Sequence, residues 1–165
     1  MIRSEILIET GLTELAKGEL ENSLALTKPR KFKQENLDFY LYLSKLLQAG
    51  KLYKKGIWLT DILGRHYRNF WSKNPQALEV YYPKAFKENF FQTADKYSLT
   101  PSLLYAIARR ESLFDPEAES SANAIGLMQV TPKTGKKIAQ KLKISHFQPE
   151  QDLKKVNSNL MISAF

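Results

Sequence analysis

Apolar residues recur at helical spacing along most of this chain. In residues 37–47, for example, apolar side chains stand three or four positions apart, and the pattern ends near Gly50. This spacing places them on one face of an α-helix, and no segment shows the strict alternation that a hairpin strand requires. We therefore expect an all-α protein in which each helix buries one face against its neighbours.

Length and composition limit the architecture. The 165 residues, of which 43% are hydrophobic, suffice for one domain or for a small domain joined to part of another. No apolar run reaches the roughly 20 residues of a transmembrane helix, and the first residues carry charges where a signal peptide is apolar. The absence of cysteine excludes disulfides and thiolate metal sites.

The formal net charge of +8 favours an anionic partner. Residues 1–80 contain 13 basic and 9 acidic side chains, and residues 81–165 contain 12 and 8. Because the excess is spread evenly along the chain, the charge argues against nucleic-acid binding, which would concentrate basic residues on one surface. An acidic membrane surface and an acidic polymer both remain open as partners.

Prolines mark a boundary near the middle of the chain. Pro75 and Pro83 bracket a short helix that reads as a junction. Before it, residues 1–80 form helices joined by short turns, as in stacked helical hairpins. We therefore divide the chain into a helical-hairpin region, residues 1–80, and a second helical region, residues 81–165.

Two expectations concern details of the first region. Gly11 and Gly18 are both expected to interrupt the helices of this segment, because glycine is the weakest helix former after proline. The helix that follows Gly50 is expected to place four apolar residues in the core: Ile57, Trp58, Ile62 and Leu63. The two histidines of the chain, His66 and His146, are far apart in sequence, so a histidine metal site has no support.

A carboxylate interrupts a helical stripe in the second region. The Thr-Pro pair at 100–101 is a good helix start, and the apolar stripe then contains Leu104, Ile107 and Ala108. Glu111 occupies the next position of this stripe. Burial and a helix C-terminus both favour the protonated carboxyl group that a general acid needs. Alternatively, Glu111 pairs with a neighbouring arginine or lies in solvent where the helix frays.

The loop that follows has the composition of a ligand-binding turn. Gly126 would allow close approach of the backbone to a ligand, and Gln129 offers both a hydrogen-bond donor and an acceptor. Met128 offers adaptable apolar contact. The alternative is an internal turn with Leu127 and Met128 in the core.

A lysine-rich helix follows this loop. It starts near Thr131, continues to about Leu142, and lies in a segment without any acidic residue between Glu119 and Glu150. A solvated lysine face and a binding patch both remain open as interpretations.

The segment AIARRESLFDPEAESSANAIGLMQVTPKTGKKIA, residues 106–139, closely resembles the Glu-Ser…Gly-Leu-Met-Gln signature of soluble lytic transglycosylases. These lysozyme-like enzymes cleave bacterial peptidoglycan. The Glu-Ser pair, the loop length, Gly-Leu-Met-Gln and the Thr-Pro of the next helix occur in the same order. The likeness covers about residues 81–165, and the preceding helices resemble the superhelical linker region of this family.

This resemblance implies a function and a set of site residues. Glu111 would be the single catalytic acid/base, forming a 1,6-anhydro sugar without water, metal or cofactor, and Ser112 would support it and the substrate. Glycan strands of peptidoglycan would be the partner, and the periplasm the location. The other residues implied to bind substrate are Gly126, Leu127, Met128 and Gln129.

The sequence departs from the family pattern at Asn123, at Ile125, where the family commonly has a small or polar residue, and at its C-terminal end. Asn123 stands where the family usually has glycine in a turn, and asparagine tolerates the left-handed conformation required there. The last helix stops at Phe165, before the family's Ala-Tyr-Asn-Ala-Gly motif. We therefore expect a partial lysozyme-like domain with poorly covered apolar residues: Leu160, Met161, Ile162 and Phe165.

Such a truncated chain leaves a second functional interpretation open. It could be an inactive helical module that binds glycan or a protein partner, through self-association or through contact with cell-wall enzymes.

Overall fold

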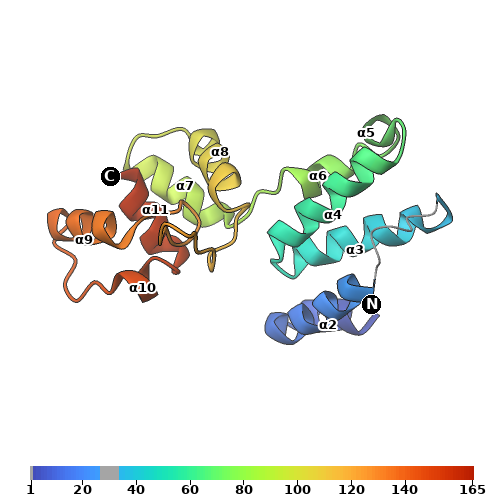
Figure 1. Ribbon diagram of the computed structural model, residues 1–165, viewed down its shortest axis with the longest axis horizontal. Helices are drawn as coiled ribbons and strands as arrows, with labels where there is room; N and C mark the ends of the chain where they lie inside the picture. Colours follow the sequence, from blue (N-terminus) through green and yellow to red (C-terminus); the bar gives the residue numbers. More distant parts are fainter. Residues whose placement is uncertain (1, 27–33) are drawn as a thin grey trace. The chain divides into compact units, whose positions relative to one another are not determined.

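The computed structural model describes residues 2–26 and 34–165 (Figure 1). Within these ranges the regular structure consists of α-helices and a short 3-10 helix, and the β-type pairing is limited to isolated bridges at Ile125. The prediction of an all-α protein is therefore confirmed. In this part of the chain, no helix combines the length and the apolarity needed to span a bilayer.

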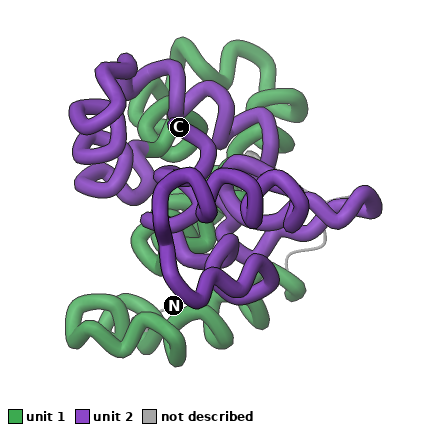
Figure 2. The backbone as a smooth tube through the Cα atoms, turned by 90° about the vertical axis from the view of Figure 1, so that its left-hand side faces the viewer, with its two compact units in different colours: residues 1–83 green, residues 84–165 purple. Residues whose placement is uncertain are grey.

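Two compact units divide the chain, residues 1–83 and residues 84–165 (Figure 2). Helix α6 (Ala77–Tyr81) lies just before the division, between Pro75 and Pro83, where the sequence predicts a short junction helix. Proline lacks a backbone N–H and restricts the residue before it, so helices rarely extend through it.

The first unit is built from helices that pack against their neighbours in sequence. Contacts join α1 to α2, α2 to α3, and α3 to α4, and α6 packs on both α3 and α4. In chain order the remaining elements of this unit are α1 (Ile2–Glu9), α2 (Thr13–Leu26), η2 (Gln34–Asn36), α3 (Leu37–Ala49), α4 (Tyr53–His66) and α5 (Phe70–Lys73).

Leucines from three helices form the core of this unit. Leu20 of α2 packs with leucines of α3 and α4 in one cluster of buried residues. The predicted apolar face of α3 is confirmed, since its apolar residues at the expected positions are buried. The fully buried leucines of this cluster are Leu20, Leu43, Leu47, Leu59 and Leu63.

The core prediction for α4 was wrong at Trp58, which is 44% exposed, whereas its neighbour Leu59 is fully buried. Gly56 explains the orientation of this helix. A Cβ atom there would lie 3.2 Å from the carbonyl oxygen of Ser44, so the backbone of α4 lies close to that of α3 at Gly56. Consecutive helical residues point about 100° apart, and this face turns Leu59 inward and Trp58 toward solvent.

The helix break predicted at Gly18 was also wrong. Helix α2 continues through this residue, because Ala16 and Leu20 on either side of it are fully buried and hold the segment in place. The break predicted at Gly11 is confirmed, since α1 ends at Glu9 and α2 begins at Thr13. The φ of Gly11 is +77°, in the left-handed region that glycine adopts without strain.

The second unit surrounds Phe90 with helices. Contacts join α7 to α8 and to α11, and α9 packs on α10 and α11. The ring of Phe90 is fully buried and stacks on that of Tyr105, with ring centroids 4.2 Å apart. In chain order the elements are α7 (Lys87–Lys96), α8 (Pro101–Glu111), α9 (Pro132–Lys141), α10 (Pro149–Asp152) and α11 (Val156–Ala164).

Helix α11 is better covered than the sequence predicts. Leu160 and Ile162 are buried, because α11 packs against α7 and α9, so the expectation that they lack cover was wrong. Phe165, directly after the helix, is 54% exposed.

Candidate active site

Glu111 is the last residue of α8, and its side chain is exposed. The prediction that it lies on a buried stripe was wrong. The inward-facing stripe runs through Leu104, Ala108 and Ser112 at steps of four residues, and all three are buried. Ile107, which is 37% exposed, and Glu111 lie one turn apart on the adjoining face.

Ser112 continues the buried stripe and ties the end of α8 to a distant loop. Its hydroxyl lies 2.8 Å from the carbonyl oxygen of Leu127 and 3.2 Å from that of Ala108. The same oxygen accepts a hydrogen bond from the backbone N–H of Asp115 at 3.2 Å. The serine next to Glu111 therefore anchors the residues around Leu127 to this helix.

The chain leaves α8 through a strained turn. Leu113 and Phe114 have φ angles of 55° and 64°, in a region that costs about 1–3 kcal/mol for residues other than glycine. Burial of the Phe114 ring among aromatic rings of α7 and α8 offsets this cost. Asp115 then accepts a hydrogen bond from the N–H of Glu117 two residues later, an arrangement typical of a turn.

The Gly-Leu-Met-Gln segment forms the tip of a miniature hairpin. Ile125 and Val130 exchange two backbone hydrogen bonds, of 2.9 and 3.1 Å, and residues 126–129 connect them. Asn123, before this hairpin, has a φ of 57°, so the left-handed conformation predicted for it is confirmed. Lys154 lies 2.7 Å from Glu119, and this hydrogen bond raises the pKa of the lysine.

Gly126 makes a close contact within the protein. Its φ is +79°, and a Cβ atom there would lie 2.1 Å from the carbonyl oxygen of Leu153 and 2.4 Å from Nδ2 of Asn159. The backbone at Gly126 is itself buried. The close approach that we expected toward a ligand is therefore an approach to the end of α10 and to α11.

Asn159 was missed by the sequence analysis. Its side chain is fully buried in α11, and Oδ1 accepts a hydrogen bond from the N–H of Met128 at 2.8 Å. Nδ2 donates to the carbonyl oxygens of Ile125 at 2.9 Å and Leu153 at 2.7 Å. One amide thus holds both sides of the hairpin. Its position next to Leu160 on an apolar helix was the signal available in the sequence.

Met128 and Gln129 line a groove of about 420 Å³. Nε2 of Gln129 donates to the carbonyl oxygens of Ala118 at 3.1 Å and Gly126 at 3.0 Å. Because both N–H groups point at protein carbonyls, its amide oxygen is the end that can receive a hydrogen bond from a ligand. The other lining residues are Ile107, Val130, Thr131, Thr134, Ile138, Ile162, Ser163 and Phe165.

The predicted site residues therefore divide into two groups. Met128 and Gln129 face the groove, and Glu111 stands one helical turn beyond Ile107, which lines it. The second group, Ser112, Gly126 and Leu127, is buried and holds the hairpin in position. Among the described residues, no cluster of three or more His, Cys, Asp or Glu side chains could hold a metal ion.

Comparison with known families identifies this part of the chain. Residues 88–164, which contain α8, the hairpin and α11, match the family described as Transglycosylase SLT domain. The matched residues are thus similar to the transglycosylase SLT domain. The resemblance seen in the Glu-Ser and Gly-Leu-Met-Gln motifs is therefore confirmed.

Proteins with similar sequences carry names from the same family. A Haemophilus influenzae protein assigned as a soluble lytic murein transglycosylase is 39% identical over 85 residues, which cover 52% of this chain and 14% of that protein. Membrane-bound lytic murein transglycosylase C of Actinobacillus pleuropneumoniae is 56% identical over 41 residues, covering 25% of this chain and 11% of its own. The chain thus spans a small part of these relatives.

Two solved structures of lytic transglycosylases are similar in fold to this chain. The 70-kDa soluble lytic transglycosylase in complex with bulgecin A matches with a TM-score of 0.66 at 23% identity. An inactive mutant of lytic transglycosylase Slt from Pseudomonas aeruginosa matches with a TM-score of 0.63 at 22% identity. Each match covers 98% of this chain and 24% of the other, and confirms the lysozyme-like all-α fold class.

Proposed function

We propose that this chain acts as a lytic transglycosylase on peptidoglycan. It would cleave the β-1,4 bond between N-acetylmuramic acid and N-acetylglucosamine and leave a 1,6-anhydro sugar. One observation carries the proposal: Glu111, at the end of α8, lies one turn beyond Ile107, which lines the groove together with Met128 and Gln129. The similarity of residues 88–164 to the transglycosylase SLT domain supports this reading of the arrangement.

A single carboxyl group can perform both proton transfers of this reaction. Protonated Glu111 would give its proton to the glycosidic oxygen as the bond from that oxygen to C1 of the muramic acid breaks. The N-acetyl oxygen of the same sugar would attack C1 and form a cyclic cation, as in substrate-assisted glycosidases. Carboxylate Glu111 would then take the proton of the 6-hydroxyl group, whose oxygen attacks C1 and displaces the N-acetyl oxygen. Glu111 ends protonated again, and no water is consumed.

The exposure of Glu111 agrees with this role. A group that exchanges protons with a bound polymer must be reachable from solvent in the free protein. A glycan strand lying over it would exclude water from the reacting groups. We therefore infer that bound substrate, rather than the protein core, removes water from around Glu111.

The remaining site residues would act in two ways. Met128 would give apolar contact to the sugar faces, and the amide oxygen of Gln129 would accept a hydrogen bond from a sugar hydroxyl or amide. Ser112, Gly126 and Leu127 would hold the hairpin that presents these two side chains.

Digestion of purified peptidoglycan, followed by mass spectrometry of the products, tests the proposal. We expect 1,6-anhydro-muropeptides from the unaltered chain, and a loss of at least about 100-fold in Glu111→Gln. Glu117→Gln removes a carboxylate from the following loop and serves as the control with unchanged product. Anhydro product that persists in Glu111→Gln would contradict the mechanism. Absence of product from the unaltered chain would instead favour a glycan- or protein-binding module.

The proposed substrate also implies a place of action. Peptidoglycan strands lie outside the cytoplasmic membrane, so we infer a periplasmic location. Cell fractionation with antibody detection would test it, and recovery in the cytoplasmic fraction would contradict it.

A further inference from the structure

Helix α9 carries a dense and uncompensated positive charge. The helix contains four lysines and a fifth follows it by two residues, in a stretch without acidic residues between Glu119 and Glu150. All five side chains are exposed, and within the described ranges none of them takes part in an ion pair with a carboxylate. These lysines are Lys133, Lys136, Lys137, Lys141 and Lys143.

Helical geometry places two of these lysines beside the groove. Thr134 and Ile138 of α9 line the groove, and Lys137 and Lys141 each follow one of them by three residues. Residues three apart are neighbours on a helix surface, so both lysines flank the groove-lining face on its solvent side. Lys136, two residues after Thr134, points to the other side of the helix.

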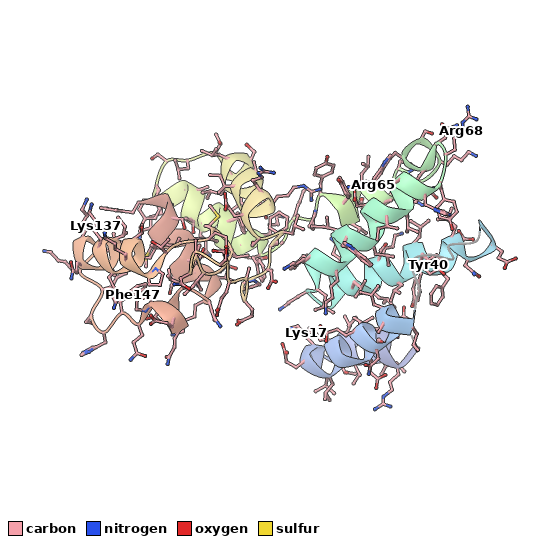
Figure 3. The ribbon with its side chains drawn as sticks, viewed as in Figure 1. Lys17, Tyr40, Arg65, Arg68, Lys137 and Phe147 are labelled. Atoms are coloured by element: carbon pink, nitrogen blue, oxygen red, sulfur yellow. The ribbon has the colours of Figure 1, made fainter. Side chains whose placement is uncertain are left out.

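The position of each lysine has an independent observation behind it. Nζ of Lys141 lies 5.9 Å from the ring centroid of Phe165, which also lines the groove. Figure 3 shows Lys137 and Phe147 at opposite edges of α9. The Phe147 ring packs on the buried side, 3.2 Å from where a Cβ of Gly135 would lie.

We propose that Lys137 and Lys141 form a binding site for carboxylates carried on substituents of the glycan strand that occupies the groove. This inference rests on the proposed function, because it takes the ligand of the groove to be peptidoglycan. Two exposed cations without acidic partners attract an anion next to the groove. Lysine presents a point charge on a flexible stem, whereas arginine favours one fixed bidentate geometry. Lysines therefore suit carboxylates on flexible peptide substituents.

Co-sedimentation with insoluble peptidoglycan tests this site without requiring turnover. One portion of the polymer keeps its carboxyl groups, and a second portion has them converted to neutral amides. The variant Lys137→Gln/Lys141→Gln is compared with Lys136→Gln/Lys143→Gln, which removes the same charge from the same segment at positions that are not one helical turn from the groove-lining Thr134 and Ile138. Circular dichroism and thermal unfolding verify that both variants remain folded.

We expect the groove-side variant to bind carboxyl-bearing polymer about 3- to 10-fold more weakly at low salt, and the control variant within about twofold of the unaltered chain. The difference should vanish on the amidated polymer and near 1 M salt, where charges are screened within about 3 Å. Equal weakening in both variants would mean general attraction by net charge and would overturn the site. So would a difference that persists on amidated polymer. Release of anhydro product is measured separately, so failure of the catalytic proposal and failure of this one are distinguishable.

Discussion

The amide of Asn159 in α11 accepts a hydrogen bond from the backbone N–H of Met128, 31 residues earlier in the chain, at 2.8 Å. The same amide donates to two further carbonyl oxygens, and it is fully buried. A side chain that was not among the predicted site residues thus controls where the groove-lining Met128 and Gln129 lie.

Asn159→Ala should destabilise the second unit strongly. It leaves one N–H and two carbonyl groups buried without their partner, and each such group costs about 1–3 kcal/mol. We expect the free energy of unfolding in urea to fall by about 3 kcal/mol or more, and the Met128 amide to lose its protection in hydrogen exchange. Gln140→Ala, an exposed position of α9 in the same unit, is the control with a change below about 0.5 kcal/mol. Unchanged protection of Met128 would contradict the assignment.

Gly126→Ala should be as damaging as a large core substitution. The added Cβ would lie 2.1 Å from a carbonyl oxygen, and φ is +79°. The backbone must shift, so we expect a loss of about 2–4 kcal/mol in thermal or urea unfolding. The same substitution at Gly18, which is exposed within α2 and has no neighbour within 4 Å of an added Cβ, should instead stabilise by about 0.5–1 kcal/mol. Similar effects at the two glycines would refute this explanation.

Ser112→Ala tests the link between α8 and the hairpin. Removal of the hydroxyl leaves the Leu127 carbonyl without its 2.8 Å partner, and we expect a loss of about 1–2 kcal/mol in stability. If the proposed activity holds, kcat should fall although Glu111 is unchanged, because Met128 and Gln129 would no longer be held in a fixed position relative to Glu111. Ser102→Ala, at an exposed position on the first turn of α8, is the control for both measurements. An unaltered kcat would show that the link is only structural.

The ionised carboxylate of Asp152 should raise the free energy of unfolding, and this effect should disappear at acid pH. Its hydrogen bond with Lys155 and that with the N–H of Gln148 lower the pKa of this carboxyl group below its ordinary value. Ionised Asp152 therefore stabilises the folded chain fully at pH values above the pKa that this carboxyl group has in the unfolded chain, near 4. The stabilisation is lost as the pH falls through the lower pKa of the folded chain. We expect Asp152→Asn to be about 1 kcal/mol less stable than the unaltered chain at pH 7. The difference should shrink progressively below pH 4 in urea titrations, and a gap independent of pH would contradict the prediction.

Local patterns in the sequence predicted many of the elements well. The start of α9 at Thr131–Pro132 follows from its capping signal, and Thr131 does accept a hydrogen bond from the N–H of Thr134. Likewise, the apolar face of α3 and the short helix between Pro75 and Pro83 depend on residues close in sequence. Such features are determined within one or two helical turns, so the sequence carries them directly.

Predictions that depended on which helix face meets a neighbour were less reliable. Trp58 and Glu111 were both placed on buried stripes, and both are exposed. In each case a residue one position away, Leu59 or Ser112, takes the inward place. A periodic pattern leaves an uncertainty of about one residue, or 100°, in the direction of a helix face, and contacts with other helices resolve it.

By itself, the sequence determined the helical class, the approximate helix limits and the motif that carries the family, because these depend on short-range spacing and residue type. Only the tertiary structure decided that Glu111 faces solvent and that Ser112, Gly126 and Asn159 hold the hairpin to α8 and α11. The physical reason is distance along the chain. Hydrogen bonds between residues 15 or 34 positions apart exist only once the helices have packed, and no local pattern encodes them.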